Sequence, residues 1–312
     1  MGPGCITKRP APGGVWHPTA DPEAAKFLMD EMVREAKIET FFHSWGVDVI
    51  QVGSSVKGVV FESKQGRQAI LAKQVIDTTG DGDVYFQAGV DFDQITHGIG
   101  FCYQIGGMDR ISPTAKPDSR RFPMRSNEPN PSLYWVNAPS VTGNGLDVRE
   151  LSAAEMHHRR EAWKKVSAMK ATQGYEAGYL SSTCSQIGVR ATRLMKGLST
   201  ISKADAVRRN GAAIADAIGV SGCEGVRRPE FGIPYGTLVP VGVDNLLAAG
   251  RCISCSPDII DRIRLFPVCF VTGQAAGAAA AMAVAKGCTP SEINVDALRK
   301  VLVSRGVYLG QG

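Results

Sequence analysis

Residues 244–254 read Asp-Asn-Leu-Leu-Ala-Ala-Gly-Arg-Cys-Ile-Ser, and residues 273–277 read Gly-Gln-Ala-Ala-Gly at the start of an alanine-rich run that ends at Ala285. The apolar run from Leu246 to Ala249, closed by glycine, is typical of a buried parallel strand. The alanine-rich run predicts a helix that begins at Gly273 and leaves free backbone N–H groups there. Such a helix start can hold a phosphate or an electron-rich group, and the spacing equally fits a closely packed core helix.

These two segments resemble part of a known family. Residues 245–254, followed by Arg264, Pro267, Cys269 and residues 273–277, resemble the C-terminal signature of the FAD-dependent oxidoreductases. That family is similar in fold to glutathione reductase and to the flavoprotein subunits of fumarate reductase. The resemblance implies that Gly250 and Arg251 pass near the ribityl chain and pyrophosphate of FAD. It also implies a helix N-terminus that faces the flavin ring and stabilises its electron-rich reduced edge. The residues implied at that helix start are Gly273, Gln274, Ala275, Ala276 and Gly277.

A second segment, residues 75–83, reads Val-Ile-Asp-Thr-Thr-Gly-Asp-Gly-Asp. It predicts a strand that ends at Gly80, then an acidic turn and a helix over residues 84–88. An acidic turn before a helix is most simply an N-cap. The string also resembles the Ala-Thr-Gly-Asp-Gly-Asp motif of the same family. On that resemblance Gly80 lets the backbone approach the cofactor, and Asp81 and Asp83 hold the turn or accept hydrogen bonds from ribityl hydroxyls.

A third segment, residues 188–193, reads Gly-Val-Arg-Ala-Thr-Arg and resembles a family string near the substrate pocket. Two interpretations of its arginines stay open. Arg190 and Arg193 either bind a substrate carboxylate and stabilise charge during hydride transfer, or form structural salt bridges with an acid such as Asp205. Tyr235, in a string that resembles another family segment, either lines the flavin face or packs in the core.

The loop that follows residues 250–254 departs from the family pattern. Relatives often carry a histidine there, whereas this chain has Cys255-Ser256-Pro257-Asp258. If that histidine carries a proton in relatives, another group takes its place here, and the candidates are Asp258, Arg264 and His97. Cys252 and Cys255 have CxxC spacing, which leaves a redox dithiol or a metal site as minor alternatives. A lone CxxC is weak evidence for either, so we predict no metal.

The expected fold is α/β: an incomplete three-layer FAD/NAD(P)-binding domain with an inserted α+β substrate domain. A complete flavoprotein of this type carries a Gly-x-Gly-x-x-Gly segment after its first strand, and this chain has none. We expect residues 1–91 to form part of the FAD-binding domain, residues 92–233 the substrate domain and residues 234–312 the rest of the FAD-binding domain. The missing segment favours a partner chain that supplies it, or a truncated reading frame, and an oligomer over a lone monomer.

Patterns along the rest of the chain predict the remaining elements. Asp21 and Pro22 predict the start of a helix that runs to about residue 37. Short β segments are expected within residues 41–73, and helices over residues 202–217, 295–303 and 151–173. On the helix over residues 151–173, an apolar stripe is expected with Leu151, Met156, Trp163, Val166 and Met169 on or near one side. The same helix carries His157 and His158. Their side chains point about 100° apart, so we expect a surface or partly packed pair rather than a metal site.

Composition places the chain among ordinary globular proteins, with 44% hydrophobic and 21% charged residues. The net charge of +5 comes from 35 basic and 30 acidic residues spread along the chain, which argues against nucleic-acid binding. The N-terminus lacks the apolar region of a signal peptide, and the run from Ala275 to Ala285 is too short to span a bilayer. Eight cysteines without a compact framework favour reduced thiols and a cytoplasmic location.

These features together predict a polypeptide that binds FAD and transfers a hydride between a small organic substrate and the flavin. The alternative is a non-catalytic subunit or interaction module derived from a flavoprotein.

Overall fold

The computed structural model describes residues 6–7, 19–112, 124–127, 130–208, 216–221 and 231–310. The chain forms two units. Unit 1 consists of Met1–Thr40 and Thr96–Arg190, and unit 2 of Phe41–Ile95 and Ala191–Gly312. The expected substrate domain, residues 92–233, differs from this division at both ends. Residues 92–95 and 191–195 belong together because β7 (Phe92–Gln94) pairs with β13 (Arg193–Met195) inside unit 2.

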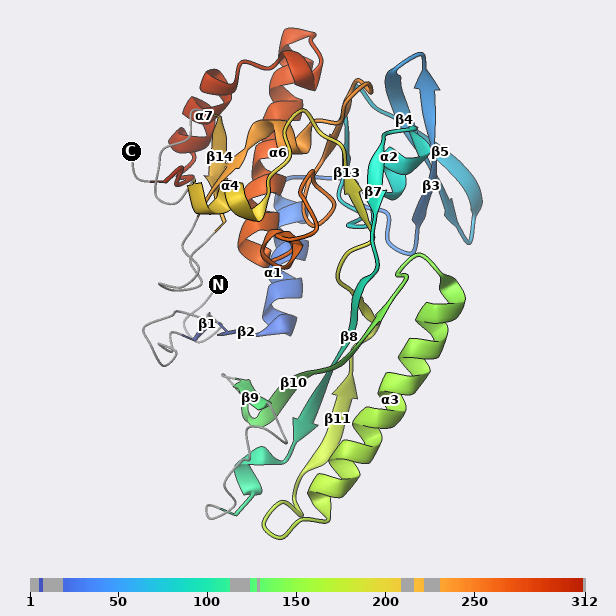
Figure 1. Cartoon of the computed structure of the whole chain (residues 1–312), viewed down its shortest axis with the longest axis vertical. Helices are drawn as coiled ribbons and strands as arrows, with labels where there is room; N and C mark the ends of the chain where they lie inside the picture. Colours follow the sequence, from blue (N-terminus) through green and yellow to red (C-terminus); the bar gives the residue numbers. More distant parts are fainter. Residues whose placement is uncertain are drawn as a thin grey trace. The chain divides into compact units, whose positions relative to one another are not determined.

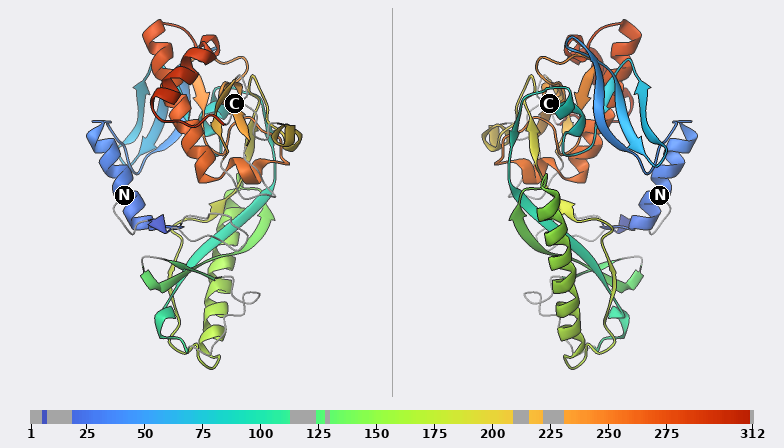
Figure 2. Two further views of the ribbon diagram at one scale, coloured as in Figure 1. Left: turned by 90° about the vertical axis from the view of Figure 1, so that its left-hand side faces the viewer. Right: turned by 90° about the vertical axis from the view of Figure 1, so that its right-hand side faces the viewer.

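Unit 1 is built on an antiparallel sheet in the order β11-β8-β10-β9, with β12 also paired to β8. Side chains alternate along β8, so its apolar residues share one face and pack against helix α3 (Figures 1 and 2). The elements of unit 1 are β1 (Ile6–Thr7), β2 (Thr19–Ala20), α1 (Pro22–Glu35), β8 (His97–Gly106), η1 (Met108–Arg110), β9 (Met124–Asn127), β10 (Asn130–Gly143), α3 (Val148–Lys170), β11 (Tyr179–Thr183) and β12 (Gly188–Val189).

Helix α3 buries a different stripe from the one expected. Its buried residues recur every three or four positions, as a helix packed on a sheet requires: Ala154, His158, Ala162, Val166 and Met169. Met156 and Trp163 were expected on or near this side, but they are exposed. The two histidines separate as expected, with His158 buried and His157 exposed. The helix begins after Asp147, whose carboxylate accepts hydrogen bonds from the N–H groups of Arg149 and Glu150.

Unit 2 contains the predicted parallel strand pair. Strands β6 and β16 run side by side with Val75 opposite Leu246 and Asp77 opposite Ala248, and β16 is fully buried. Strands β3 (Trp45–Val52), β4 (Ser55–Ser63) and β5 (Gly66–Leu71) form a meander. Besides β7 and β13, unit 2 contains in chain order β6 (Val75–Asp77), α2 (Asp83–Gln87), α4 (Lys203–Arg208), β14 (Ala217–Val220), β15 (Gly232–Pro234), η2 (Tyr235–Leu238), β16 (Leu246–Ala248), α5 (Ile260–Ile263), α6 (Phe266–Lys286), η3 (Pro290–Glu292) and α7 (Val295–Ser304).

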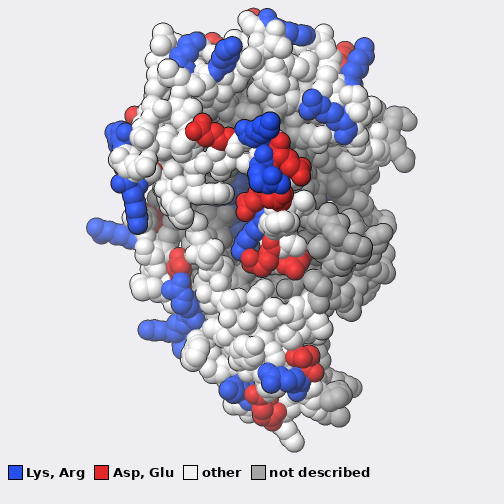
Figure 3. Space-filling model, turned by 180° about the vertical axis from the view of Figure 1, so that it is seen from behind, with Lys and Arg blue, Asp and Glu red and all other residues white. Residues whose placement is uncertain are grey.

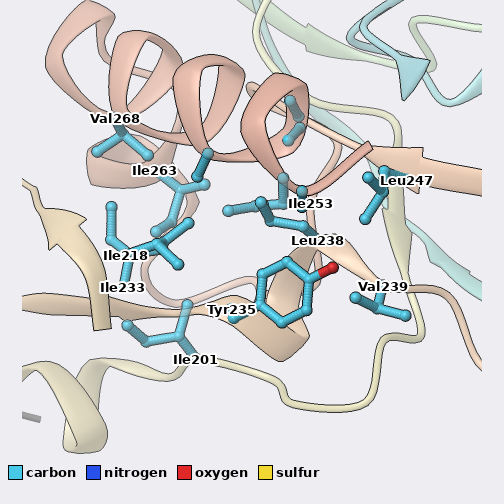
Figure 4. Packing of buried hydrophobic residues seen from close by; sticks show 14 of the residues in the cluster. Ile201, Ile218, Ile233, Tyr235, Leu238, Val239, Leu247, Ile253, Ile263 and Val268 are labelled. Carbon is cyan, nitrogen blue, oxygen red and sulfur yellow. The ribbon is translucent and has the colours of Figure 1, made fainter. Parts of the chain in front are cut away.

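The main core of unit 2 forms around helix α6. Figure 4 shows Ile218 and Ile233, from the hairpin β14–β15, lying beside Ile263 and Val268 at the start of the helix. Leu247 of β16 and Ile253 of the following loop join the same cluster. Helix α7 packs against α6 through the buried residues Leu298 and Leu302. The core therefore joins the strand that ends before Gly250 to the helix that follows it.

Helix α6 begins at Phe266, so the prediction that it begins at Gly273 is wrong. Gly273 lies in the third turn, where its N–H group is used within the helix and is not free. Pro267 in the first turn and the burial of Val268 and Thr272 extend the helix toward the N-terminus. Among the described residues, α6 is the one helix long and apolar enough to cross a membrane by length and composition. The expectation that residues 275–285 are too short to span a bilayer therefore does not apply to the whole helix, much of which packs in the core.

Local signals elsewhere are confirmed. Asp21 caps α1, because its carboxylate accepts hydrogen bonds from the N–H groups of Glu23 and Ala24 at 2.9 and 3.4 Å. Ser202 and Asp205 bond to each other at the start of α4. The helix expected over residues 202–217 ends differently, since α4 is described to residue 208 and Ala217 begins β14. Residues 209–215 lie outside the described part of the chain.

Charged side chains of both signs are intermixed on the face of the molecule in Figure 3. Ion pairs one helical turn apart occur on α1, between Lys26 and Glu23, and on α3, between Arg159 and Glu155. Exposed pairs of this kind contribute little to stability.

Candidate functional site

The turn after β6 is organised by Asp77, a residue that the sequence analysis did not select. Its carboxylate is completely buried and accepts hydrogen bonds from Thr79 N at 2.9 Å and Thr79 Oγ1 at 2.7 Å. It also accepts from the N–H groups of Val84 and Tyr85, both at 3.0 Å, and so caps α2. Asp81 and Asp83 were the expected caps, but neither serves as the N-cap, because Gly82 occupies that position. The signal for Asp77 was its place at a strand end, six residues before the helix.

Asp81 is therefore available for another role, and it pairs with Arg251. Arg251 Nη1 and Nη2 donate to the two carboxylate oxygens of Asp81 at 2.6 and 2.7 Å. The hydroxyl of Thr192, which is fully buried, donates to Oδ1 of Asp81 at 2.7 Å. Burial lowers the pKa of Arg251, but hydrogen bonding and charge from Asp81 outweigh it, so the net shift of this pKa is upward. The pair connects the loop after β6 to the loop after β16.

Arg193 completes the same cluster. Its Nη1 donates to the backbone oxygen of Asp81 and to Oδ1 of Asp83, each at 2.9 Å. Its guanidinium also lies 4.3 Å from the centre of the Phe86 ring. The salt-bridge interpretation therefore holds for Arg193, with Asp83 as its partner in place of Asp205.

Two glycines in the left-handed region follow the parallel strands. Gly80 has φ +80° and Gly250 has φ +84°. A Cβ atom at Gly80 would lie 2.7 Å from Nε of Arg251, so only glycine admits the arginine there. Gly250 N donates to Thr272 Oγ1 of α6 at 3.0 Å. Both glycines lie beyond the carboxyl ends of parallel strands, which is where open α/β sheets bind ligands.

The exposed face of α6 adds to this region. Gly273 and Gly277 are exposed, and a Cβ at either would meet no atom within 4 Å. Gln274 is exposed beside them, whereas Ala275 and Ala276 are fully buried. The side chains of Ala275 and Ala276 therefore face the core and not a cofactor, which corrects their assignment. Sequence reasoning also missed an exposed aromatic pair on the first turns of this helix, Phe266 and Phe270, whose rings stack at 6.2 Å.

Two of the remaining candidates for catalysis, Arg264 and Asp258, make other contacts within unit 2. Arg264 Nε and Nη2 donate to Asp261 at 3.0 and 2.8 Å. Asp258 is exposed and accepts hydrogen bonds from Ser256 Oγ and from Lys203 N. His97 and Arg190 belong to unit 1, where His97 Nδ1 accepts from the N–H of Gly98 at 2.7 Å.

Two alternatives from the sequence are resolved by burial. Tyr235 is buried and its hydroxyl donates to Pro290 O at 2.9 Å, so it packs in the core and does not line a flavin face. Cys252 and Cys255 are free thiols with at most 2% of their surface exposed. Burial raises the pKa of Cys255 to about 12 and also raises that of Cys252. No group of metal-binding side chains occurs among the described residues.

Solved structures similar to this chain include flavoenzymes. One is p-nitrophenol 4-monooxygenase PnpA from Pseudomonas putida, with 11% identity and a TM-score of 0.41 over 93% of this chain and 56% of that one. Another is a geranylgeranyl bacteriochlorophyll reductase-like protein from Thermoplasma acidophilum, with 11% identity and a TM-score of 0.47 over 96% and 67%. A third is the myxobacterial FAD-dependent halogenase CndH, with 13% identity and a TM-score of 0.42 over 96% and 59%. A comparison with curated proteins gave no match.

The chain thus spans 56% of the length of that monooxygenase and 59% of that of the halogenase. The family model for FAD dependent oxidoreductases matches residues 4–302. The residues at the strand ends suit a cofactor that carries hydroxyl groups, because the carboxylate of Asp81, held by Arg251, is partly exposed and Gly250 is partly exposed as well. With a match over nearly its whole length, the chain belongs to the FAD dependent oxidoreductase family, an enzyme family whose cofactor is FAD.

Proposed function

We propose that this chain carries the flavin-ring half of an FAD site and transfers a hydride between a small organic substrate and the flavin. The observation that supports it is the Asp81–Arg251 pair between two left-handed glycines at the carboxyl ends of β6 and β16. When bound, FAD supplies the redox centre, and the protein supplies binding, orientation and charge.

Asp81 is suited to hold a ribityl hydroxyl. A carboxylate has about four acceptor positions, and Arg251 and Thr192 use three of them. The remaining position, on Oδ2, is available to a hydroxyl donor. Arg251 orients the carboxylate through its two hydrogen bonds, and Gly80 lets the guanidinium lie against the backbone. On α6, the exposed Gly273 and Gly277 carry no side chains, so the backbone there is open to a ligand.

The adenosine half of the site would come from a further strand at the open edge of β6. Val75 N donates to Asn245 O and Asp77 O accepts from Ala249 N, both toward β16. Because alternate peptide groups point to opposite edges of a parallel strand, those of Ile76 point to the other edge. Among the described strands, β16 is the sole partner of β6. A partner chain or additional segment with a Gly-x-Gly-x-x-Gly loop would extend the sheet there.

The alternative, a non-catalytic interaction module, is favoured by exposed apolar side chains. Phe266 and Phe270 on α6 are 77% and 69% exposed, and Phe27 and Met32 on α1 are also exposed. Such side chains suit a protein interface as well as a cofactor site.

A cytoplasmic location is also part of the proposed function, because the six cysteines described are free thiols.

A flavin titration separates the two functions. The chain would be purified alone and together with the product of any adjacent reading frame, and each preparation titrated with FAD while flavin fluorescence and absorbance are recorded. We expect quenching and a shifted absorbance band, at least in the co-purified form, and weaker binding in Asp81→Asn. An absence of flavin binding in both preparations would contradict the oxidoreductase function and leave the interaction module.

A further inference from the structure

One face of the unit 1 sheet is polar. Along β8, the residues that alternate with the buried apolar ones are Gly98, Gly100, Cys102 and Gln104. On the neighbouring strand β10, Asn137 lies opposite Cys102, and Ser140 opposite Gly100. We call these six residues the polar sheet face. The opposite face packs against α3, so this one is turned away from the core of unit 1.

Arg190 lies across the two glycines of the polar sheet face. A Cβ at Gly98 would lie 3.2 Å from Cδ and Nη1 of Arg190, and a Cβ at Gly100 would lie 3.4 Å from Nη2. The backbone holds the residue in register, because Arg190 N donates to Gly98 O at 3.3 Å. Two glycines on one face of a strand weaken the strand, and here they make room for a guanidinium.

The charge of Arg190 lacks a carboxylate partner within the described part of the chain. In this respect it differs from Arg193, Arg251 and Arg264, each of which pairs with an aspartate. Arg190 is also partly buried. A partly buried cation without a counter-ion is costly, and a planar guanidinium binds a carboxylate at two points.

Polar groups surround the guanidinium. Ser140 Oγ would lie 3.0 Å from a Cβ at Gly98, which places the hydroxyl beside the arginine. Cys102 Sγ donates to Asn137 Oδ1 at 3.7 Å. Burial is the main cause that raises the pKa of Cys102, and the charge of Arg190 acts in the opposite direction. The thiol of Cys102 is exposed, so it reports on the charge beside it.

We propose that the polar sheet face binds the carboxylate of a small organic acid through Arg190, with Ser140 as a neighbouring hydrogen-bond donor. This inference rests on the proposed function and names the class of its substrate. It assigns different roles to two arginines that are three residues apart: Arg190 binds the ligand, and Arg193 holds the turn that contains Asp81 and Asp83.

The test measures alkylation of Cys102 by iodoacetamide in the full chain without flavin, followed by mass spectrometry. The probes are succinate, its neutral analogue succinamide, and inorganic phosphate, each at the same millimolar concentration and ionic strength. A carboxylate on Arg190 cancels the positive field that favours the thiolate, which is the reacting form. We therefore expect succinate to lower the rate at which iodoacetamide alkylates Cys102 by about three- to tenfold. Cys288, in unit 2, is the internal reference, and its alkylation rate should not change.

Variants check the role of Arg190 directly. Arg190→Met should abolish the protection by succinate, and Arg190→Lys should retain a reduced part of it, since lysine keeps the charge but loses the two-point geometry. Arg149→Met, which removes an exposed arginine of the same unit, should leave the protection unchanged. The comparison of probes on the unaltered chain needs no variant, so it stands even if Arg190→Met does not fold.

Three results would overturn the inference: no protection by succinate, equal protection by succinamide, or protection by phosphate as strong as that by succinate. The last would indicate a general anion site. Because the assay contains no flavin, its failure is distinct from a failure of the flavin titration.

Discussion

Arg251 and Asp81 form a two-point ion pair between residues 170 positions apart, with N–O distances of 2.6 and 2.7 Å. The pair closes the space between the ends of two parallel strands, and about a fifth of each side chain is exposed. Partial burial makes such a pair more sensitive to the loss of one partner than an ion pair in full contact with water. It is therefore the contact on which the candidate site most directly depends.

Replacing Asp81 by Asn should destabilise unit 2. The amide keeps the size of the side chain but leaves Arg251 without its counter-ion, and we expect a loss of about 1–3 kcal/mol in the free energy of unfolding. Asp93→Asn is the matched control, because Asp93 forms an ion pair with Lys196 in which both side chains are nearly half exposed. Its loss should cost about 0–1 kcal/mol. Urea unfolding of both variants measures the difference, and equal costs would show that the Asp81 pair contributes no more than a surface contact.

A second prediction compares two glycines with nearly the same backbone conformation. Gly80 has φ +80° and Gly89 has φ +76°, but a Cβ at Gly89 meets nothing within 4 Å. Gly89→Ala should therefore lower the free energy of unfolding only by the cost of the left-handed conformation, about 1–2 kcal/mol. Gly80→Ala should add about 1–3 kcal/mol, because its Cβ would lie 2.7 Å from Nε of Arg251. Thermal unfolding midpoints compare the two, and a smaller shift for Gly80→Ala would mean that Arg251 moves away freely.

Stability should depend on pH through His158. This residue is fully buried, its Nε2 lies 3.2 Å from Ile99 O, and burial lowers its pKa below 6.5, with nearby His157 acting in the same direction. In the unfolded chain the imidazole gains a proton near pH 6.5, whereas in the folded chain it does so only at lower pH. The unfolded state thus binds more protons in that window, so stability falls as pH falls below about 6.5.

Urea unfolding from about pH 7.5 to about pH 5.5 measures this dependence. Its steepest slope from one such group is about 1.4 kcal/mol per pH unit. His158→Gln should flatten the dependence, while His157→Gln, at an exposed position, should retain most of it. The same slope in both variants would assign the effect to other groups.

Thiol reactivity should follow burial. Cys102 is exposed, whereas Cys252 and Cys255 are buried and have raised pKa values. We expect iodoacetamide to label Cys102 first, and to label Cys252 and Cys255 about 100-fold more slowly or only in denaturant. Peptide mass spectrometry over time resolves the order. Rapid labelling of Cys252 or Cys255 in the native protein would revive the redox dithiol that their spacing suggested.

Signals that act over a few residues were readable from the sequence. Asp21 caps α1, and Ser202 with Asp205 opens α4, because a cap and its N–H partners lie within three residues of each other. The apolar runs at residues 75–77 and 246–248 also predicted two strands, which pair in parallel. The glycines that follow them, Gly80 and Gly250, lie at the candidate site. Helix α6 was also identified, but its start was placed seven residues too late. Its first turns contain the β-branched residues Val268 and Thr272, whose burial in the core favours the helix there.

The sequence by itself determined the family and the parallel strand pair, and it supplied candidate residues for the site without Asp77. Tertiary structure alone decided what each of those residues contacts. Asp77, and not Asp81, caps α2, which leaves Asp81 to Arg251. Arg190 and Arg193 share one motif, yet Arg193 is paired with Asp83, whereas Arg190 lies over two glycines and pairs with no carboxylate of the described residues. The physical reason is that ion pairs form between atoms brought together by folding, whatever their separation along the chain.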